Sequence, residues 1–174
     1  IDGTFLCWPG LGNEPSTPDV NSIDDLVTMT LEHMKEPVDI VAQSMGGLVA
    51  IKAALAAPEK LGRLVLTATS AGIPVTDLGA SNWSKDYYRA YPHAAAWIAD
   101  TKEDMSDRIT SIRASTLLIW GDNDPISPVA VGERLLSLFP NAHFHVVCGG
   151  DHDLAQTHAE IVAKLLRHHF ANAS

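Results

Sequence analysis

Residues 38–47 read Val38-Asp39-Ile40-Val41-Ala42-Gln43-Ser44-Met45-Gly46-Gly47. The apolar run at the start of this stretch predicts a strand, and the Ala-rich segment after it predicts a helix. A serine between the two, with Ala42 and Gly46 two residues to either side, is typical of a tight strand-to-helix turn that lifts the serine above a sheet. Such a turn aims the Met45 N–H at an oxyanion forming beside the Ser44 oxygen. The alternative is a serine that only caps the helix, but a cap needs no small neighbours.

The rest of the chain alternates short apolar runs with longer helical runs. Strands are predicted over residues 4–8, 38–42, 64–68, 117–120 and 143–147, and helices over residues 23–34, 45–57, 129–139 and 154–170. This alternation indicates βαβ units, so we predict an α/β three-layer sandwich with a mostly parallel sheet of about five strands. Residues 73–110 contain no predicted strand, and we interpret them as a short helical cap inserted into a single domain of residues 1–174.

Composition and charge exclude several classes of protein. The 174 residues carry a net charge of −9, which argues against nucleic-acid binding and against a polybasic membrane anchor. No apolar stretch approaches the roughly 20 residues of a membrane span, and we favour a cytoplasmic location. Two cysteines, Cys7 and Cys148, are too few for a disulfide scaffold and are expected to be buried free thiols. Because the chain begins at Ile1 without a Met, we expect either removal of an N-terminal segment or a fragment.

Two later loops carry the groups that would activate a serine. Asp122 and Asp124 follow the predicted strand 117–120, and His152 lies in a Gly-rich loop after strand 143–147. A nucleophilic serine needs a base, and the base needs an acid that holds its tautomer. Parallel strands end at one edge of a sheet, so Ser44, an aspartate and His152 are expected to meet there. The alternative for both aspartates is a local role in turns and caps.

A metal site is a weaker interpretation of the same loops. A cluster can be imagined from Asp122, Asp124, Asp151, His152 and Asp153. A Ser-Asp-His triad already accounts for an aspartate and for His152, so we predict no metal and no cofactor.

Taken together, these motifs resemble the α/β-hydrolase family over nearly the whole chain. Residues 42–47 resemble its nucleophile elbow, with Ala42 in place of the first Gly as in small bacterial lipases. The resemblance implies Ser44 as the nucleophile, Asp124 rather than Asp122 as the acid, and His152 as the base. Asp151 stands where the family usually has Gly. The implied activity is hydrolysis of a small-molecule carboxylic ester through an acyl-enzyme, with acyl transfer to alcohols as a side activity.

Other functions remain open on the same residues. The triad would also serve thioester, amide, lactone or carbon–carbon cleavage. A function from another class is that of a non-catalytic binding protein on a hydrolase scaffold.

The segment Trp8-Pro9-Gly10-Leu11-Gly12 admits two alignments with the family. In the first, it is the oxyanion loop and the Leu11 N–H is the second oxyanion donor beside Met45. In the second, which we favour, it is a later Pro-Gly-x-Gly loop. The short distance along the chain from Gly10 to Ser44 suits this second alignment.

Aromatic residues and an exposed edge complete the expectations. Trp83, Tyr87 and Tyr91 are spaced four residues apart, so one helix face can present all three rings above Ser44 as an apolar substrate pocket. Packing of the cap onto the body explains at least one of these rings equally well. If the chain is a fragment, an exposed edge at residues 4–8 predicts either a homodimer or aggregation.

Overall fold

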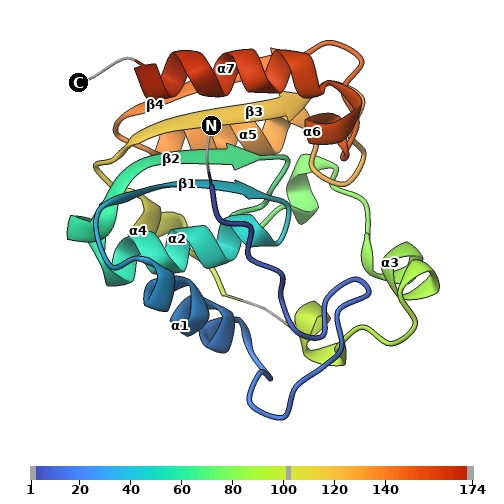
Figure 1. Cartoon of the computed structure of the whole chain (residues 1–174). Coiled ribbons are helices and arrows are strands. Elements are labelled where there is room, and N and C mark those ends of the chain that lie inside the picture. Colours follow the sequence, from blue (N-terminus) through green and yellow to red (C-terminus); the bar gives the residue numbers. More distant parts are fainter. Residues whose placement is uncertain (1–2, 101–102, 172–174) are drawn as a thin grey trace.

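The computed structural model describes residues 3–100 and 103–171, so Ile1 and residues 101–102 of the predicted cap lie outside it. At its centre is a four-stranded parallel sheet in the order β1-β2-β3-β4 (Figure 1). Its strands are β1 (Val38–Gln43), β2 (Leu61–Thr67), β3 (Ser115–Gly121) and β4 (Ala142–Val147). The predicted fold class is confirmed. The strand predicted over residues 4–8 is wrong, because these residues pair with no strand of the sheet.

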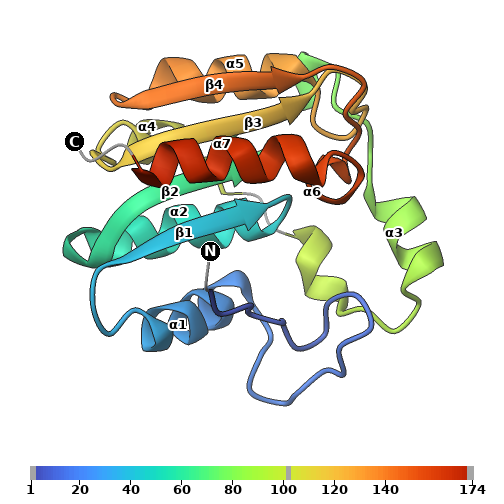
Figure 2. The ribbon, with the colours of Figure 1, turned by 45° about the horizontal axis from the view of Figure 1, so that its top comes forward.

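Helices cover both faces of the sheet and make three layers (Figure 2). One face carries α1 (Ile23–His33), α2 (Gly46–Ala56), α4 (Ser106–Ile109) and α5 (Val129–Leu138). The other face carries α6 (Leu154–Thr157) and α7 (Ala159–Ala171). The single helix predicted over residues 154–170 is therefore interrupted, at His158.

The inner strands supply two hydrophobic cores, one on each face. Along β2, Leu64 and Leu66 pack against the α1 and α2 side, whereas Val65 packs against the α7 side. Successive side chains of a strand point to opposite faces, which is why a continuous apolar run is needed when both faces are covered. The fully buried Trp120 of β3 belongs to the first core and Ile119 to the second.

Residues 4–8 form no strand, although one edge of β1 is left without a neighbouring strand within the described residues. A strand needs a neighbour for its backbone hydrogen bonds, and residues 4–8 do not pair with β1. Phe5 is 95% exposed. Cys7 and Cys148 are both exposed as well. The prediction of buried thiols is wrong because Cys7 lies outside the sheet and Cys148 already belongs to the loop that follows β4.

A capping interaction starts α1. The Ser22 side-chain oxygen accepts a hydrogen bond from the Asp25 N–H, and the Asp25 carboxylate accepts one from the Asn21 N–H at 2.9 Å. The Asn21 bond is the main reason that the pKa of Asp25 is lowered. The first bond satisfies one of the amides that the first turn of a helix leaves without a partner, and the second joins the residue before the cap to that turn.

Between β2 and β3 the described residues form only short helical elements. They are η2 (Thr76–Leu78), α3 (Ser84–Ala90), η3 (Ala96–Asp100) and α4, and η1 (Pro58–Lys60) lies just before β2. Two hydrogen bonds join this segment to the N-terminal loop: the Gly12 N–H donates to the Tyr87 hydroxyl at 2.8 Å, and the Ala95 N–H donates to the Gly10 carbonyl at 2.7 Å. Of the helices described, none has the length and apolar character to cross a bilayer.

Helix α7 buries a histidine with an unpaired ring nitrogen. His169 is 9% exposed, and its Nε2 has no hydrogen-bond partner among the described residues. Burial is the main reason that the pKa of His169 is lowered; a hydrogen bond with the backbone of Ser115 raises it, and the nearby charge of Arg63 lowers it. A base with a lowered pKa in the folded state binds fewer protons there than in the unfolded chain, so stability falls as the pH falls.

We therefore expect His169→Leu to reduce the loss of stability that begins as the pH drops below the ordinary histidine pKa of 6.5. Urea unfolding midpoints measured at several pH values check this, with the exposed His33→Leu as the matched control. Equal pH dependence in His169→Leu and wild type would contradict the assignment.

Candidate active site

Ser44 stands on a strained turn between β1 and α2. Its φ of 52° is left-handed, a conformation that is uncommon for any residue but glycine. The Ser44 N–H donates to the Thr67 carbonyl of β2 at 3.0 Å, and the Gly47 N–H donates to the Ser44 carbonyl at 3.0 Å. A Cβ on Gly47 would overlap the side chain of Thr69. The small residue that this turn requires is therefore Gly47, since a Cβ on Gly46 would meet only an ordinary contact.

His152 connects Ser44 to Asp124 through its two ring nitrogens. Nε2 lies 2.9 Å from the Ser44 Oγ, and Nδ1 lies 2.9 Å from the Asp124 Oδ2. The Asp124 side chain is fully buried, and its Oδ1 accepts hydrogen bonds from the N–H groups of Ile126 and Ser127 at 2.8 and 3.1 Å. The structure thus brings together the three side chains that the sequence singled out, in the geometry of a nucleophile, a base and an orienting acid.

Asp122 has a different contact. Its Oδ1 accepts a hydrogen bond from the Gly149 N–H at 2.6 Å, so it binds the backbone of the loop that carries His152. A Cβ on Gly121 would overlap the Gly150 carbonyl, so the two loops approach each other at their glycines. The Asp151 carboxylate binds within its own loop and to α6. Its Oδ1 accepts bonds from the Asp153 N–H and the Thr157 hydroxyl.

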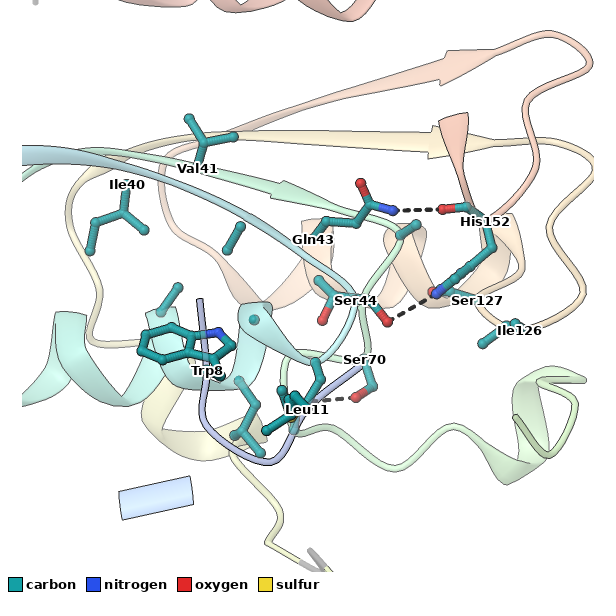
Figure 3. A pocket seen from close by; sticks show the side chains of 18 of the residues that line it. Trp8, Leu11, Ile40, Val41, Gln43, Ser44, Ser70, Ile126, Ser127 and His152 are labelled. Carbon is teal, nitrogen blue, oxygen red and sulfur yellow. Dashed lines mark hydrogen bonds between the residues drawn. The ribbon is translucent and has the colours of Figure 1, made fainter. Parts of the chain in front are cut away.

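Two residues at the site were missed by the sequence analysis. The Gln43 Nε2 donates to the backbone carbonyl of His152 at 2.9 Å (Figure 3). The Ser127 hydroxyl accepts a hydrogen bond from the indole Nε1 of the buried Trp120 at 3.1 Å. The position of Gln43 directly before Ser44 was a signal for the first residue. Nothing in the sequence pointed to the second.

The backbone donors near Ser44 differ in what they bind. We find no hydrogen bond from the Met45 N–H within the described residues. The Leu11 N–H, by contrast, donates to the Trp8 carbonyl at 3.1 Å within its own turn. Leu11 lines the cavity beside Ser44 (Figure 3), while its amide already has a partner in that turn.

A cavity of about 1710 Å³ lies beside Ser44 and His152. It runs between the N-terminal loop, β1 and the segment that follows β2. Trp83 and Tyr87 are among its lining residues, whereas Tyr91 is not. The three rings do contact one another in turn: Trp83 and Tyr87 meet edge to face with centroids 5.5 Å apart, and Tyr87 and Tyr91 are tilted with centroids 5.0 Å apart. The Tyr91 ring packs against Tyr87 and is not part of the cavity lining among the described residues, and its substrate-binding role stays a prediction.

Comparison with known proteins agrees with this architecture. Residues 2–165 match the model of the alpha/beta hydrolase family. The chain belongs to the alpha/beta hydrolase family. Among solved structures, this hydrolase is similar to an alpha/beta hydrolase enzyme from the metagenome of sediments of the Mar Chica lagoon in Morocco, with a TM-score of 0.70 and 23% identity over 90% of the chain and 73% of that protein. It is also similar to a thermophilic esterase from Thermogutta terrifontis, with a TM-score of 0.73 and 19% identity over 91% of the chain and 75% of that protein.

A curated relative has a longer chain. The hydrolase is 27% identical over 208 aligned positions to a 2-hydroxy-6-oxononadienedioate/2-hydroxy-6-oxononatrienedioate hydrolase of Paraburkholderia phymatum. The match covers 91% of this chain and 72% of the relative. Because the aligned positions outnumber the 174 residues of this chain, the relative carries internal segments that this hydrolase lacks.

The contact between Trp120 and Ser127 predicts a stability effect. Ser127→Ala would leave the buried indole N–H without its acceptor, so we expect the free energy of unfolding to fall by about 1–3 kcal/mol. Chemical denaturation measures this loss. The exposed Ser137→Ala on α5 is the matched control and should change stability by less than about 0.5 kcal/mol. An equal effect of the two substitutions would show that the Trp120–Ser127 contact contributes nothing.

Proposed function

We propose that this hydrolase cleaves small-molecule carboxylic esters through an acyl-enzyme formed on Ser44. The observation that carries the proposal is the continuous chain of hydrogen bonds from the Ser44 hydroxyl through both nitrogens of His152 to the buried Asp124 carboxylate. A serine hydroxyl becomes nucleophilic when an adjacent base accepts its proton.

The proposed reaction has two steps. The Ser44 oxygen attacks the ester carbonyl while His152 Nε2 takes the serine proton, and Asp124 stabilises the imidazolium that results. The Met45 N–H donates to the oxyanion of the tetrahedral intermediate, and His152 returns the proton to the leaving alcohol. In the second step, His152 removes a proton from a water molecule, which attacks the acyl carbonyl and releases Ser44. An alcohol in place of this water gives acyl transfer.

Cleavage of a carbon–carbon bond is the second candidate, and the name of the Paraburkholderia relative favours it. That name denotes a dioate, a substrate with two carboxylates. Anions that leave water are stabilised by cationic partners. Apart from imidazoles and the Tyr87 phenol, the ionisable side chains among the described residues that line the cavity are the carboxylates of Asp39, Glu103 and Asp104. Glu103 is paired with Lys52 at 2.6 Å and Asp39 with Arg63 at 3.6 Å. Among the described residues the cavity lining includes no lysine or arginine side chain, which supports a neutral ester over a dianionic substrate.

A fluorophosphonate probe tests the proposal directly. We expect a single adduct on Ser44 by intact mass and peptide mapping, and its loss in Ser44→Ala and His152→Ala. Turnover of neutral activated esters should disappear in the same two variants. A folded protein that gives neither adduct nor turnover would instead be a binding protein on a hydrolase scaffold.

Substitution of Asp124 and of Asp122 tests which aspartate orients His152. Asp124→Asn should lower kcat by about 10⁴-fold, because the amide favours the wrong tautomer of His152. Asp122→Asn retains an oxygen acceptor for the Gly149 N–H and should retain activity within about tenfold. Ester kinetics on both variants measure the difference. Similar losses in the two variants would contradict the assignment of Asp124 as the orienting acid.

A further inference from the structure

Two consecutive residues of the elbow bind the same histidine. The Ser44 Oγ lies 2.9 Å from the ring Nε2 of His152, and the Gln43 amide donates to the backbone carbonyl of His152 at 2.9 Å (Figure 3). A hydrogen bond to the ring alone leaves the main chain free to pivot about the side-chain torsions. A second bond to the backbone fixes the place from which the side chain starts.

The strand order makes this second bond significant. Ser44 follows β1 and His152 follows β4, and these are the two outer strands of the sheet, with β2 and β3 between them (Figure 1). The loop of residues 148–153 must therefore lean back across the end of the sheet to reach the elbow. Asp122 and the contact between Gly121 and Gly150 hold this loop to the end of β3. Gln43 holds it to β1.

We propose that Gln43 is a positioning residue that keeps His152 within reach of the Ser44 hydroxyl. This inference rests on the proposed function, since it assigns a role within the same site. The Gln43 side chain is half-buried, and it adjoins a cavity of about 360 Å³ beside α6 and α7. Small and flexible residues line that cavity, among them Ala155, Ala159 and Leu166. A side chain of similar length in place of Gln43 therefore has room to fit.

Replacing Gln43 by Met or by His separates the effect of the hydrogen bond from the effect of packing, because the three side chains have a similar length. In Gln and His the Nε2 atom lies the same number of bonds from Cα, and in Met the terminal carbon occupies that position without a donor. We expect Gln43→Met to lower kcat for a neutral activated ester by about 10- to 100-fold, because small misplacement of a reacting group is costly. KM should change less than kcat, since the Gln43 amide N–H binds the His152 carbonyl. Gln43→His supplies a ring N–H and should restore most of kcat.

Controls distinguish positioning from damage to the fold. Gln156→Met, on the exposed side of α6, should leave kcat and KM unchanged. Thermal unfolding of Gln43→Met should match that of wild type, and Gln43→Leu provides a second donor-free variant if the Met variant does not fold. The rate of fluorophosphonate labelling of Ser44 should fall in parallel with kcat.

The outcomes separate this inference from the proposed function. Ester turnover by wild type, with kcat unchanged in Gln43→Met, would overturn the role of Gln43 and leave the proposed function standing. Equal losses in Gln43→Met and Gln43→His would also overturn it, because the donor would then be irrelevant. A wild-type protein without turnover or labelling would overturn the proposed function and this inference with it.

Discussion

The left-handed backbone of Ser44 is the constraint on which the rest of the site depends. A φ of 52° costs a non-glycine residue roughly 1–2 kcal/mol. Strand β2 holds the strained residue in place through the bond from the Ser44 N–H to the Thr67 carbonyl, and the absence of a side chain on Gly47 lets α2 approach Thr69. The chain can thus pass from β1 to α2 within one sharp turn, which leaves the Ser44 hydroxyl above the end of the sheet.

The order of the strands separates the base from the serine, and the loops bring the two together. Because the base follows one outer strand and the serine follows the other, the loop of residues 148–153 must cross the ends of the two inner strands. Backbone packing at Gly121 and Gly150, the carboxylate of Asp122 and the amide of Gln43 all hold this loop. Asp124 itself is fixed by two backbone N–H groups on its second oxygen. The imidazole of His152 is therefore placed by backbone contacts as much as by its own ring.

The cavity walls depend on contacts between segments that are distant in sequence. The hydroxyl of Tyr87 and the carbonyl of Gly10 join the segment that follows β2 to the N-terminal loop. Tyr87 therefore both lines the cavity and accepts a hydrogen bond from the Gly12 N–H. Leu11 lines the cavity too, while its N–H is held within the turn.

Local patterns in the sequence determined much of this protein. Apolar runs and helical periodicity identified the four strands that form and the principal helices, because burial on both faces of a parallel sheet imposes those patterns. The motif around Ser44 and the loops after the last two strands identified the residues that meet at the sheet edge, since parallel strands end on the same side.

Tertiary structure decided whatever depends on a neighbour far away in the chain. An apolar run at residues 4–8 forms a strand only if another strand pairs with it, and none of the described residues does so. The exposure of Cys7 and Cys148, the separate contacts of Asp122 and Asp124, and the bond from Gln43 to His152 likewise follow from packing between distant segments. Local sequence carries the preferences of each segment, whereas the choice among competing hydrogen-bond partners is made only when the segments meet.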